Sequence, residues 1–480
     1  MSVKKIRFIE PSNAPYRKSI ENLFVYDKYI RNPSIGLMTL ATVAKQKCSD
    51  VLMYSESISK IKWEDVFDAD IIFISIFTFS AIRGYKMARY IKKHSNAVVI
   101  IGGLHASMNY RESVKYCDYV MVGEGDESIL EVIDAVDNNS PVEEVKGIAC
   151  IKNGKLFFSG KRRPPENIDI IPDRYLCYNY RKMSGHNTLW AQVHASRGCP
   201  HNCDYCALVR HYGRRVRKRS PENILEDIRQ SIAFHDEGHH RLAKMLWITD
   251  DNFFADRKWA ISVLNAIIKS DINYNFTIQA RYEVGFDDEM LELLKKAGFS
   301  ELAMGIEFLE DEAFENNNKN CTYNDIVRSV RNIQKHGLRV RGLFIVGADN
   351  HTVGVGERIA DFVIKYDICG VLIQSMYFVP NTPVYDTHKD RLLDNDWSKC
   401  IGNVVHYPEN ISPYELQKEI ILASGKIYSG KRLLKTIVTK KGIERLLFVG
   451  EFMWQKNVRE RLSRELPRLE MLSRKHGYSF

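Results

Sequence analysis

Three cysteines stand close together in the stretch SRGCPHNCDYC, at positions 199, 203 and 206. Cysteine thiolates bind zinc and iron–sulfur clusters, and the two kinds of site differ in the ligands they need. A structural zinc site uses four ligands, and the nearby candidates for the fourth are His194, His201 and His211. Three local thiolates can instead hold three irons of a [4Fe–4S] cluster and leave the fourth iron open to another molecule. The triplet therefore favours a cluster over zinc.

The residues beside the triplet suit negatively charged ligands. Gly198 allows the backbone to turn tightly, and the positive charge of Arg197 favours thiolates. A basic segment, RHYGRRVRKRS, follows at 210–220 and leads into a helix that Ser220 caps, with Pro221 at its first position. We interpret this segment as a solvated face or as a contact to a small phosphate or carboxylate group.

Length and composition are typical of a globular protein with more than one domain. The chain has 480 residues, of which 45% are hydrophobic and 27% are charged. No apolar run reaches the roughly 18 residues of a membrane span. The first residues, MSVKKIRFIEPSN, lack the pattern of a signal peptide, so we expect a cytoplasmic protein. The net charge of +9 is modest for this length, and nucleic acid is not an expected partner.

The remaining seven cysteines are scattered singly along the chain. Disulfides are not expected in the cytoplasm, so we interpret these residues as small buried hydrophobic side chains. They are Cys48, Cys117, Cys150, Cys177, Cys321, Cys369 and Cys400.

Residues 1–140 alternate short apolar runs with helical patterns. Runs such as IRFIE, DIIFISIF and AVVIIGG are apolar throughout, as in parallel strands that are covered on both faces. This alternation predicts a doubly wound parallel sheet, whose ligand lies beyond the carboxyl ends of its strands. Small residues stand at those ends, where they either close tight turns or hold a ligand. They are Ser75 to Thr78, Gly102-Gly103 and Gly123-Glu124-Gly125.

Residues 141–185 interrupt this alternation with a predicted hairpin, which turns at Asn153-Gly154, and a connector punctuated by prolines. A second alternation fills residues 186–394 and predicts a partial (β/α)6 barrel, with its active site at the carboxyl ends of the strands. The cysteine triplet follows the first of these strands. The predicted helices are 221–234, 257–270, 287–297, 324–337 and 355–367. Residues 395–480 predict a helical C-terminal domain.

The stretch CPHNCDYC fits the CxxxCxxC motif of radical S-adenosylmethionine enzymes, and the resemblance to this family covers nearly the whole chain. It implies that Cys199, Cys203 and Cys206 bind a [4Fe–4S] cluster, whose open iron takes the amino and carboxylate groups of S-adenosylmethionine (SAM). Reductive cleavage of SAM gives a 5′-deoxyadenosyl radical, which abstracts hydrogen from an unactivated position. The protein is expected to orient the reactants and to exclude water.

Further stretches of the barrel, WITDDNFFAD, IQARYEV and AMGIEF, stand where the family contacts SAM. The residues that the resemblance implicates are Tyr205, Asp250, Asp251, Gln279, Arg281 and Glu307. The sequence Asp-Asp-Asn at 250–252 replaces the common Gly-Gly-Glu, as in the branch with an N-terminal cobalamin-binding domain. Each residue also has a structural alternative. The aspartates can cap a helix, Glu307 can pair with an arginine, and Gln279 can be a satisfied buried amide.

The N-terminal domain resembles the cobalamin-binding domain of that branch. The matching residues are Ser75, Phe77, Thr78, Gly102, Gly103, His105, Gly123, Glu124 and Gly125. The branch's DxHxxG histidine is absent from EPSNAPYRKS, so no lower cobalt ligand is expected from that loop. His105 is more consistent with a supporting or helix-capping role than with cobalt ligation. Loss of cobalamin binding is the alternative.

The resemblance predicts a cobalamin-dependent radical SAM methyltransferase that acts on an unactivated carbon or a phosphorus centre. A non-methylating radical reaction, such as oxidative cyclisation, rearrangement or carbon–carbon coupling, is the alternative within the family. An electron-transfer protein without catalysis is the alternative outside it. Cys321 and Cys369 are chemical candidates for a second hydrogen donor, and no catalytic residue is assigned.

The expected partners are a small-molecule or lipid substrate and an external electron donor such as flavodoxin or ferredoxin. The C-terminal stretch RLLKTIVTKKGIERLLFVGEFMW is basic and apolar, which is typical of a segment that contacts a membrane surface. An amphipathic helix that packs on the barrel is the alternative.

Overall fold

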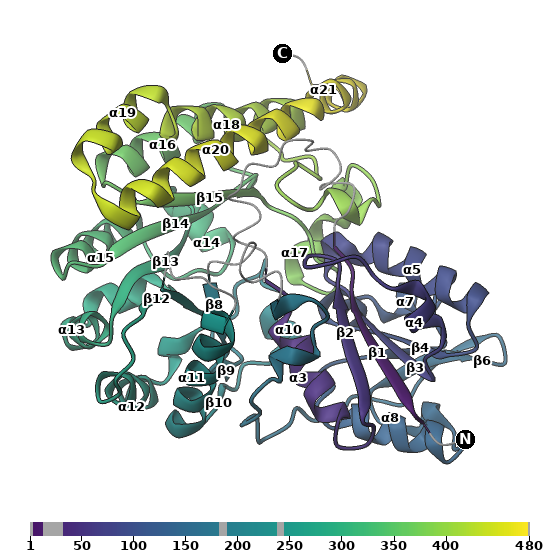
Figure 1. The fold of residues 1–480 in the computed structure, drawn as a ribbon. Helices are drawn as coiled ribbons and strands as arrows, with labels where there is room; N and C mark the ends of the chain where they lie inside the picture. The colour runs from purple at the N-terminus through teal and green to yellow at the C-terminus, as the bar shows by residue number, and fades with distance from the viewer. Residues whose placement is uncertain (1–2, 13–31, 182–189, 238–243, 479–480) are drawn as a thin grey trace.

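The computed structural model describes residues 3–12, 32–181, 190–237 and 244–478. Figure 1 shows the N-terminal sheet at the lower right, a second sheet at the left and the C-terminal helices at the top. This is the predicted α/β architecture of a doubly wound sheet, a partial barrel and a helical extension.

The N-terminal sheet has the strand order β2-β1-β3-β4-β5-β6-β7. Strands β1 to β5 are parallel, as predicted, whereas β6 and β7 are antiparallel. The strands are β1 (Lys5–Glu10), β2 (Asp50–Ser55), β3 (Ile71–Ser75), β4 (Val98–Gly102), β5 (Tyr119–Met121), β6 (Ile148–Lys152) and β7 (Lys155–Phe158). Because β1 lies between β2 and β3, the winding direction reverses there, and a crevice is expected at the carboxyl ends of the strands.

Both faces of this sheet are buried. Along β1, Ile6 and Phe8 belong to one hydrophobic cluster and Ile9 to another, because successive side chains of a strand point to opposite faces. The covering helices are α3 (Ile35–Ala44), α4 (Trp63–Phe67), α5 (Ala81–His94), α6 (Leu104–Met108), α7 (Tyr110–Ser113) and α8 (Ser128–Asp137). Burial on both sides explains why the strand sequences are apolar throughout.

Strands β6 and β7 form the hairpin predicted within residues 141–185. Asn153 and Gly154 have φ angles of 51° and 73°, as a two-residue hairpin turn requires. Since β6 also pairs with β5, the hairpin extends the N-terminal sheet instead of standing apart from it. Residues 182–185 of the predicted connector lie outside the described residues.

Six parallel strands form the second sheet, in the order β15-β14-β13-β12-β11-β8. They are β8 (Trp190–Val193), β11 (Met245–Ile248), β12 (Asn275–Ala280), β13 (Phe299–Glu307), β14 (Arg339–Val346) and β15 (Gly370–Ser375). The helices between them are α11 (Pro221–Glu237), α12 (Arg257–Ile268), α13 (Asp288–Lys296), α14 (Asp311–Asn316), α15 (Tyr323–Lys335) and α16 (Val355–Lys365). Within the described ranges β8 and β15 do not pair, so the curled sheet is a partial barrel, as predicted.

After β15 the chain crosses to the N-terminal sheet and then returns to the barrel. The crossing segment contains α17 (Pro383–His388), and its Trp397, Cys400 and Val405 pack in the core of the N-terminal sheet. The final helices are α18 (Pro413–Ile427), α19 (Gly430–Thr439), α20 (Gly442–Arg464) and α21 (Leu466–Lys475). Helix α18 packs on α16 and carries α20 and α21. No helix in the described ranges is long and apolar enough to span a membrane.

Candidate functional site

The three cysteines lie in the loop that follows β8, at the carboxyl end of the barrel strands. The chain forms β9 (Ser196–Arg197), runs through the cysteine loop and α10 (Leu208–Tyr212), and returns in β10 (Arg217–Lys218), antiparallel to β9. Gly198 has a φ of +97°, and a Cβ there would lie 2.4 Å from the carbonyl oxygen of Arg215. Glycine is therefore needed for the two arms of the loop to approach this closely.

Two of the thiols receive hydrogen bonds from side chains of neighbouring strands. Nδ2 of Asn252, after β11, lies 3.7 Å from Sγ of Cys199. Nη1 of Arg281, after β12, lies 3.7 Å from Sγ of Cys203. Burial raises the pKa of the Cys199 thiol, so the metal-free thiol is neutral near pH 7. Donors aimed at sulfur stabilise a thiolate once a metal has displaced its proton.

The third thiol is supported by the start of α10. Backbone N–H groups of Val209 and Leu208 donate to Cys206, while burial raises the pKa of its thiol to about 11. Among the described residues, no three His, Cys, Asp or Glu side chains converge as the ligands of one metal ion do. The thiolates of a [4Fe–4S] cluster each bind a different iron, so they need not converge in this way. The donors present fit a cysteine-ligated cluster.

Arg197 does not face the thiols, contrary to our expectation. Its guanidinium donates to Oε2 of Glu124 at 2.8 Å and to the two carboxylate oxygens of Asp126 at 2.8 and 3.0 Å. Arg217 donates to the two carboxylate oxygens of Glu124 at 2.5 and 2.9 Å. All four side chains are buried, and a buried arginine is stable only beside a carboxylate. We call these four residues the interdomain network, because they join the barrel to the N-terminal sheet.

The next arginine of the basic segment is also paired inside the protein. Arg219 donates to Oδ2 of Asp227 at 2.6 Å and to the carbonyl oxygen of His194 at 2.7 Å. The expectation of a solvated face or an anion contact is therefore wrong for this arginine and for the one in the interdomain network. The expected helix cap is present, since Oγ of Ser220 accepts from the N–H of Asn223 at 3.3 Å.

The two aspartates after β11 occupy different places. Asp250 accepts from the N–H of Ala195 at 2.6 Å and from Oγ of Ser196 at 2.5 Å, so it holds the strand that leads to the cysteine loop. Burial raises its pKa to about 7. Asp251 accepts a bond of 3.4 Å from the loop backbone, and burial raises its pKa to about 6. Neither caps α12, which Asp256 caps instead.

Residues predicted on the next two strands gather beside the cysteine loop. Arg281 pairs with Glu283 at 2.9 Å in addition to its contact with the loop. Gln279 lies half-buried on β12, and its amide has no hydrogen bond with another described residue. Tyr205 packs edge-on against Phe308, with ring centroids 6.1 Å apart. The structure thus brings these side chains to the carboxyl end of the strands, where SAM is expected to bind.

Glu307, at the end of β13, has a φ of +68°, a strained conformation for a residue other than glycine. Lys319 holds this turn. Its Nζ donates to the carbonyl oxygens of Gly305 at 2.5 Å and of Ile306 at 3.3 Å, and lies 3.7 Å from Oε1 of Glu307. Only 1% of the lysine side chain is exposed. Glu307 therefore pairs with a lysine that the sequence did not point to, and not with an arginine.

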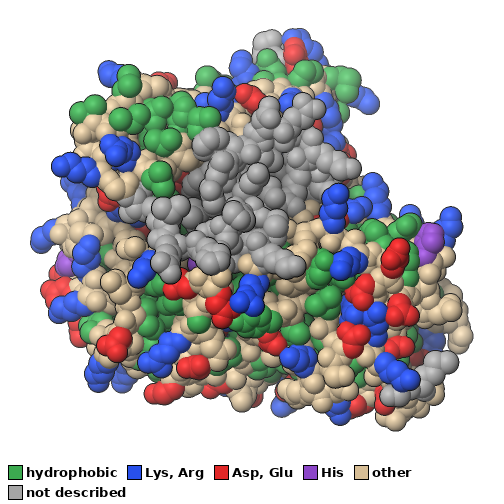
Figure 2. All heavy atoms as spheres, in the orientation of Figure 1, with side chains coloured by type: hydrophobic (Ala, Val, Ile, Leu, Met, Phe, Trp, Pro, Cys, Tyr) green, Lys and Arg blue, Asp and Glu red, His purple; other side chains and the backbone are tan. Residues whose placement is uncertain are grey.

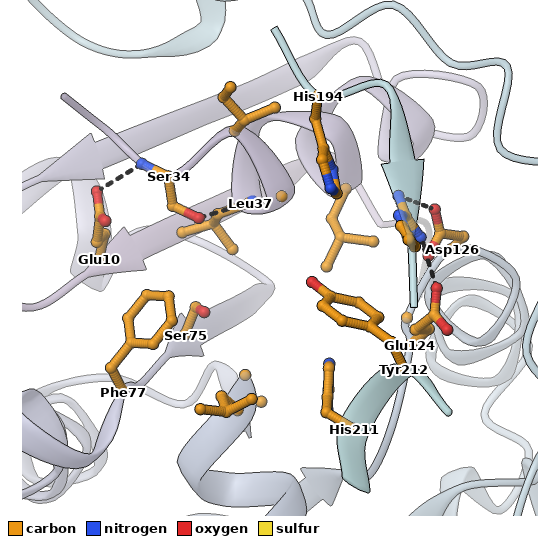
Figure 3. A pocket seen from close by; sticks show the side chains of 18 of the residues that line it. Glu10, Ser34, Leu37, Ser75, Phe77, Glu124, Asp126, His194, His211 and Tyr212 are labelled. Atoms are coloured by element: carbon orange, nitrogen blue, oxygen red, sulfur yellow. Dashed lines mark hydrogen bonds and ion pairs between the residues drawn. The ribbon is translucent and has the colours of Figure 1, made fainter. Parts of the chain in front are cut away.

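A cavity of about 390 Å³ lies between the carboxyl ends of the two sheets (Figure 3). Most of the predicted cobalamin residues line it, namely Ser75, Phe77, Gly102, Gly103, Gly123, Glu124 and Gly125. A Cβ on Gly103, whose φ is +92°, would lie 2.7 Å from Oγ of Ser75 and 2.8 Å from the backbone of Ile76. A Cβ on Gly123 would meet no atom within 4 Å. This wall is bare backbone, which fits close contact with a large group.

Two of the predicted cobalamin residues, Thr78 and His105, lie outside this wall. Nδ1 of the fully buried His105 lies 3.2 Å from Oγ1 of Thr78, and its ring packs edge-on against Trp397 at 5.4 Å. Burial lowers the pKa of His105 to about 4, so the ring is neutral. These contacts fit the expected supporting role beneath the cavity.

The barrel contributes a polar wall to the same cavity. His194, His211 and Tyr212 point into it from the side of the cysteine loop (Figure 3). Burial lowers the pKa of His194 to about 3 and that of His211 to about 4. Nδ1 of His211 is buried and has no hydrogen-bond partner among the described residues. The sequence suggested the histidines only as zinc ligands, because nothing local showed that they face the N-terminal domain.

Residues 193–363 match the sequence profile described as the radical SAM superfamily. This part of the chain therefore carries a radical SAM domain. The matched range begins just before the cysteine loop and includes β11 to β14, which carry the predicted SAM contacts. A radical SAM domain implies a [4Fe–4S] cluster and SAM as cofactors and an external source of electrons. The prediction that the protein is a radical SAM enzyme is confirmed.

Named relatives extend the similarity beyond the matched range. The chain is 24% identical over 446 residues to bacteriochlorophyllide d C-12(1)-methyltransferase of Chlorobaculum tepidum, covering 92% of this chain and 90% of that protein. It is 27% identical over 293 residues to anaerobic magnesium-protoporphyrin IX monomethyl ester cyclase of Rubrivivax gelatinosus, covering 58% of this chain and 51% of that protein.

A solved structure has the same overall fold. It is the cobalamin-dependent S-adenosylmethionine radical enzyme OxsB with aqua-cobalamin and S-adenosylmethionine bound, at a TM-score of 0.72 and 14% identity. The match covers 96% of this chain and 72% of OxsB. The likeness includes the N-terminal sheet, the partial barrel and the C-terminal helices, and it confirms the predicted fold class.

Proposed function

We propose that this radical SAM enzyme is a cobalamin-dependent methyltransferase that acts on an unactivated carbon or a phosphorus centre of a small molecule. One observation carries the proposal. A single cavity is walled on one side by bare glycine backbone at the switch point of the N-terminal sheet and on the other by the cysteine-loop side of the barrel. A cofactor held there lies between the two domains.

In this proposal, Cys199, Cys203 and Cys206 hold the cluster. Arg281 and Asn252 stabilise its thiolates. When bound, the reduced cluster supplies the electron that cleaves SAM to a radical, and cobalamin supplies the methyl group.

The predicted SAM residues divide into two groups. We propose that Tyr205, Asp251, Gln279 and Arg281 contact SAM directly, because they lie at or beside the cysteine loop at the carboxyl ends of the strands. We propose that Asp250 positions the cysteine loop instead, since both of its carboxylate oxygens already accept hydrogen bonds from Ala195 and Ser196. Lys319 would keep Glu307 in its strained conformation, with the carboxylate beside the predicted SAM site.

The glycine wall is proposed to hold cobalamin, with Ser75 and Phe77 beside it. Thr78 and His105 would support this wall from beneath. Glu124 would act by fixing the loop at 123–126, because its carboxylate is fully used by two arginines. The neutral imidazole of His211 can accept or donate a hydrogen bond to the bound group.

A non-methylating radical reaction is the second candidate, and the similarity to a magnesium-protoporphyrin monomethyl ester cyclase supports it. The substrate, whether small molecule or lipid, and an electron donor such as flavodoxin or ferredoxin stay predictions. So do the cytoplasmic location and the division into domains at 1–140, 141–185, 186–394 and 395–480. The pairing of β6 with β5 favours assigning the hairpin to the first domain.

Anaerobic reconstitution with iron, sulfide, reductant, SAM and methylcobalamin tests the proposal. We expect 5′-deoxyadenosine and S-adenosylhomocysteine among the products, and a corrinoid absorption spectrum that survives washing. 5′-Deoxyadenosine without S-adenosylhomocysteine, on protein that has lost its corrinoid, would favour the non-methylating reaction. Metal analysis that returned zinc without iron and sulfide would contradict the cluster.

A further inference from the structure

Helix α19 (Gly430–Thr439) lies on the surface with no buried side chain. Its outward residues include large apolar ones, with Leu434 66% exposed, Ile437 42% exposed and Val438 81% exposed. Leu446, one turn into α20, is 62% exposed. Figure 2 shows hydrophobic side chains gathered over this region at the upper left of the molecule. Exposed large apolar side chains that form one patch mark an interaction surface.

The helix is attached to the protein by its opposite side. Leu433 packs against the barrel core, and Arg432 donates to the carbonyl oxygens of Ile368 and Ile427 at 3.2 and 3.3 Å. Residues 434, 437 and 438 recur at the helical spacing of three and four, so they share the face that points away from these contacts. Packing on the barrel, which was the alternative reading of this stretch, therefore uses only one side of the helix.

Basic residues stand beside the apolar patch along the chain. Lys431, Lys435, Lys441 and Arg445 are exposed, and none of them forms an ion pair with another described residue. Between residues 430 and 446 the sequence has six basic residues and one acidic residue, Glu444. A helix with an apolar face and unpaired basic residues beside it is complementary to a layered surface, in which an anionic outer layer covers an apolar interior.

We propose that α19 and the first turn of α20 form a docking surface for an anionic lipid bilayer, with the helix lying in the plane of the interface. Leu434, Ile437, Val438 and Leu446 enter the boundary between head groups and acyl chains, while the lysines contact lipid phosphates. The helix bound in this way lies on the membrane and does not cross it.

The docking surface is placed at the base of the barrel. Arg432 and Lys440 contact Ile368 and Asp367, which lie two and three residues before β15, and the cysteine loop lies at the other end of the strands. The surface therefore localises the protein without touching the cavity between the two sheets. The proposal is independent of the proposed reaction, and its test needs no turnover.

Flotation of the cluster-loaded protein with vesicles tests the proposal. We expect binding to vesicles of phosphatidylcholine and phosphatidylglycerol in equal parts, weak binding to pure phosphatidylcholine, and loss of binding as salt is raised. The double substitution Leu434→Ser with Val438→Ser removes the apolar contacts. The double substitution Lys431→Gln with Lys435→Gln removes two charges. Each is expected to weaken partitioning by about tenfold or more.

Met471→Ser is the matched control, because Met471 on α21 is 62% exposed but lies outside the basic patch. It is expected to bind vesicles like the unchanged protein. All variants are checked for cluster content and circular dichroism, since each change is at the surface and should leave the fold intact. Equal binding by the Leu434/Val438 variant and the unchanged protein would overturn the proposal. So would a salt-insensitive dimer that dissociates in that variant, because a second copy would then be the occupant.

Discussion

Two largely buried networks of arginines and carboxylates hold the barrel to its neighbours, at opposite ends of its strands. The interdomain network of Arg197, Arg217, Glu124 and Asp126 lies beside the cysteine loop. The second, which we call the base network, lies where the strands begin. Its members are Arg339, Arg341, Glu301 and Glu451.

The base network joins the barrel to α20. Nε of Arg341 lies 2.6 Å from Oε1 of Glu301, and its guanidinium also pairs with Glu451 of α20. Tyr428 donates to the same Glu451 at 2.7 Å. Each network contains two positive and two negative side chains, and each lines a cavity. The cavity at the base has a volume of about 1150 Å³ and lies beneath α19 and α20.

The two networks differ in the cavity that each one lines. Glu124, Asp126 and Arg197 line the cavity between the two sheets, whereas the base network is separated from that cavity by the length of the strands. Similar charge arrangements should therefore contribute similarly to stability and differently to catalysis.

Substituting one cysteine at each end of the barrel, Cys206 or Cys369, should give the largest difference in activity between the two ends. Cys206→Ser removes a predicted cluster ligand, so we expect 5′-deoxyadenosine formation to fall by more than about 100-fold, as a lost metal ligand disables the site. Cys369→Ser changes a thiol that lies 3.4 Å from Glu301 in the base network, and near-normal activity is expected. Iron and sulfide content and product chromatography measure both. Full activity of Cys206→Ser would exclude its assignment as a ligand.

Neutralising one carboxylate in each network is the second test. Glu124→Gln and Glu301→Gln each leave a largely buried arginine with less compensation, which should lower the free energy of unfolding by about 3 kcal/mol. Only Glu124→Gln is expected to reduce corrinoid retention, because only Glu124 fixes the loop at 123–126. Urea unfolding and the absorption spectrum of washed protein provide the two readouts. Equal loss of corrinoid in two equally folded variants would show that the networks do not differ in this way.

The buried carboxyl group of Asp250, beside the cysteine loop, should make the free energy of unfolding depend on pH. The pKa of Asp250 is raised to about 7 by burial, so its carboxyl stays protonated in the folded state at pH values where it ionises in the unfolded chain. Stability is therefore highest below the unfolded pKa and declines as pH rises toward 7, by up to roughly 1.4 kcal/mol per pH unit. Asp250→Asn keeps a side chain that can both accept and donate, and should flatten this slope. An unchanged slope between pH 5 and 7, measured by urea unfolding, would contradict the assignment.

Helix caps should give the smallest effects. Ser220→Ala removes the cap of α11, and Ser412→Ala removes the capping box of α18. Each is expected to lower the free energy of unfolding by about 1 kcal/mol, because one N–H loses its partner. Thermal unfolding measures both changes. If Ser220→Ala alone lost corrinoid, any local change near Arg217 would be enough to weaken corrinoid binding. The loss expected from Glu124→Gln could then not be assigned to the change in charge.

Much of the architecture was predictable because it depends on short-range patterns. The apolar strands, the turn at Asn153-Gly154 and the cap at Ser220 each arise from a few consecutive residues. The cysteine triplet was also local, and its position after the first barrel strand followed from the alternation. Gly103 stood out for the same reason, since a turn at the end of a parallel strand often needs positive φ.

The partners of the charged residues were not predictable. Arg197 and Glu124 are 73 residues apart, and Arg217 is 93 residues from Glu124, so only the docking of two domains brings them together. Lys319 lies in the polar stretch ENNNKNC, which is typical of an exposed loop. It is buried because the loop folds back over the end of β13, a contact that no local pattern records.

The interdomain network also bears on how the molecule can be assembled or rebuilt. Glu124 and Asp126 are synthesised before Arg197, and N-terminal domains generally fold first during synthesis, so the carboxylates can be in place when the cysteine loop appears. In a barrel expressed without its N-terminal sheet, Arg197 and Arg217 would lack their carboxylate partners, Glu124 and Asp126. A chimera that gives this barrel a different N-terminal domain must therefore bring two carboxylates to the same positions, or replace both arginines.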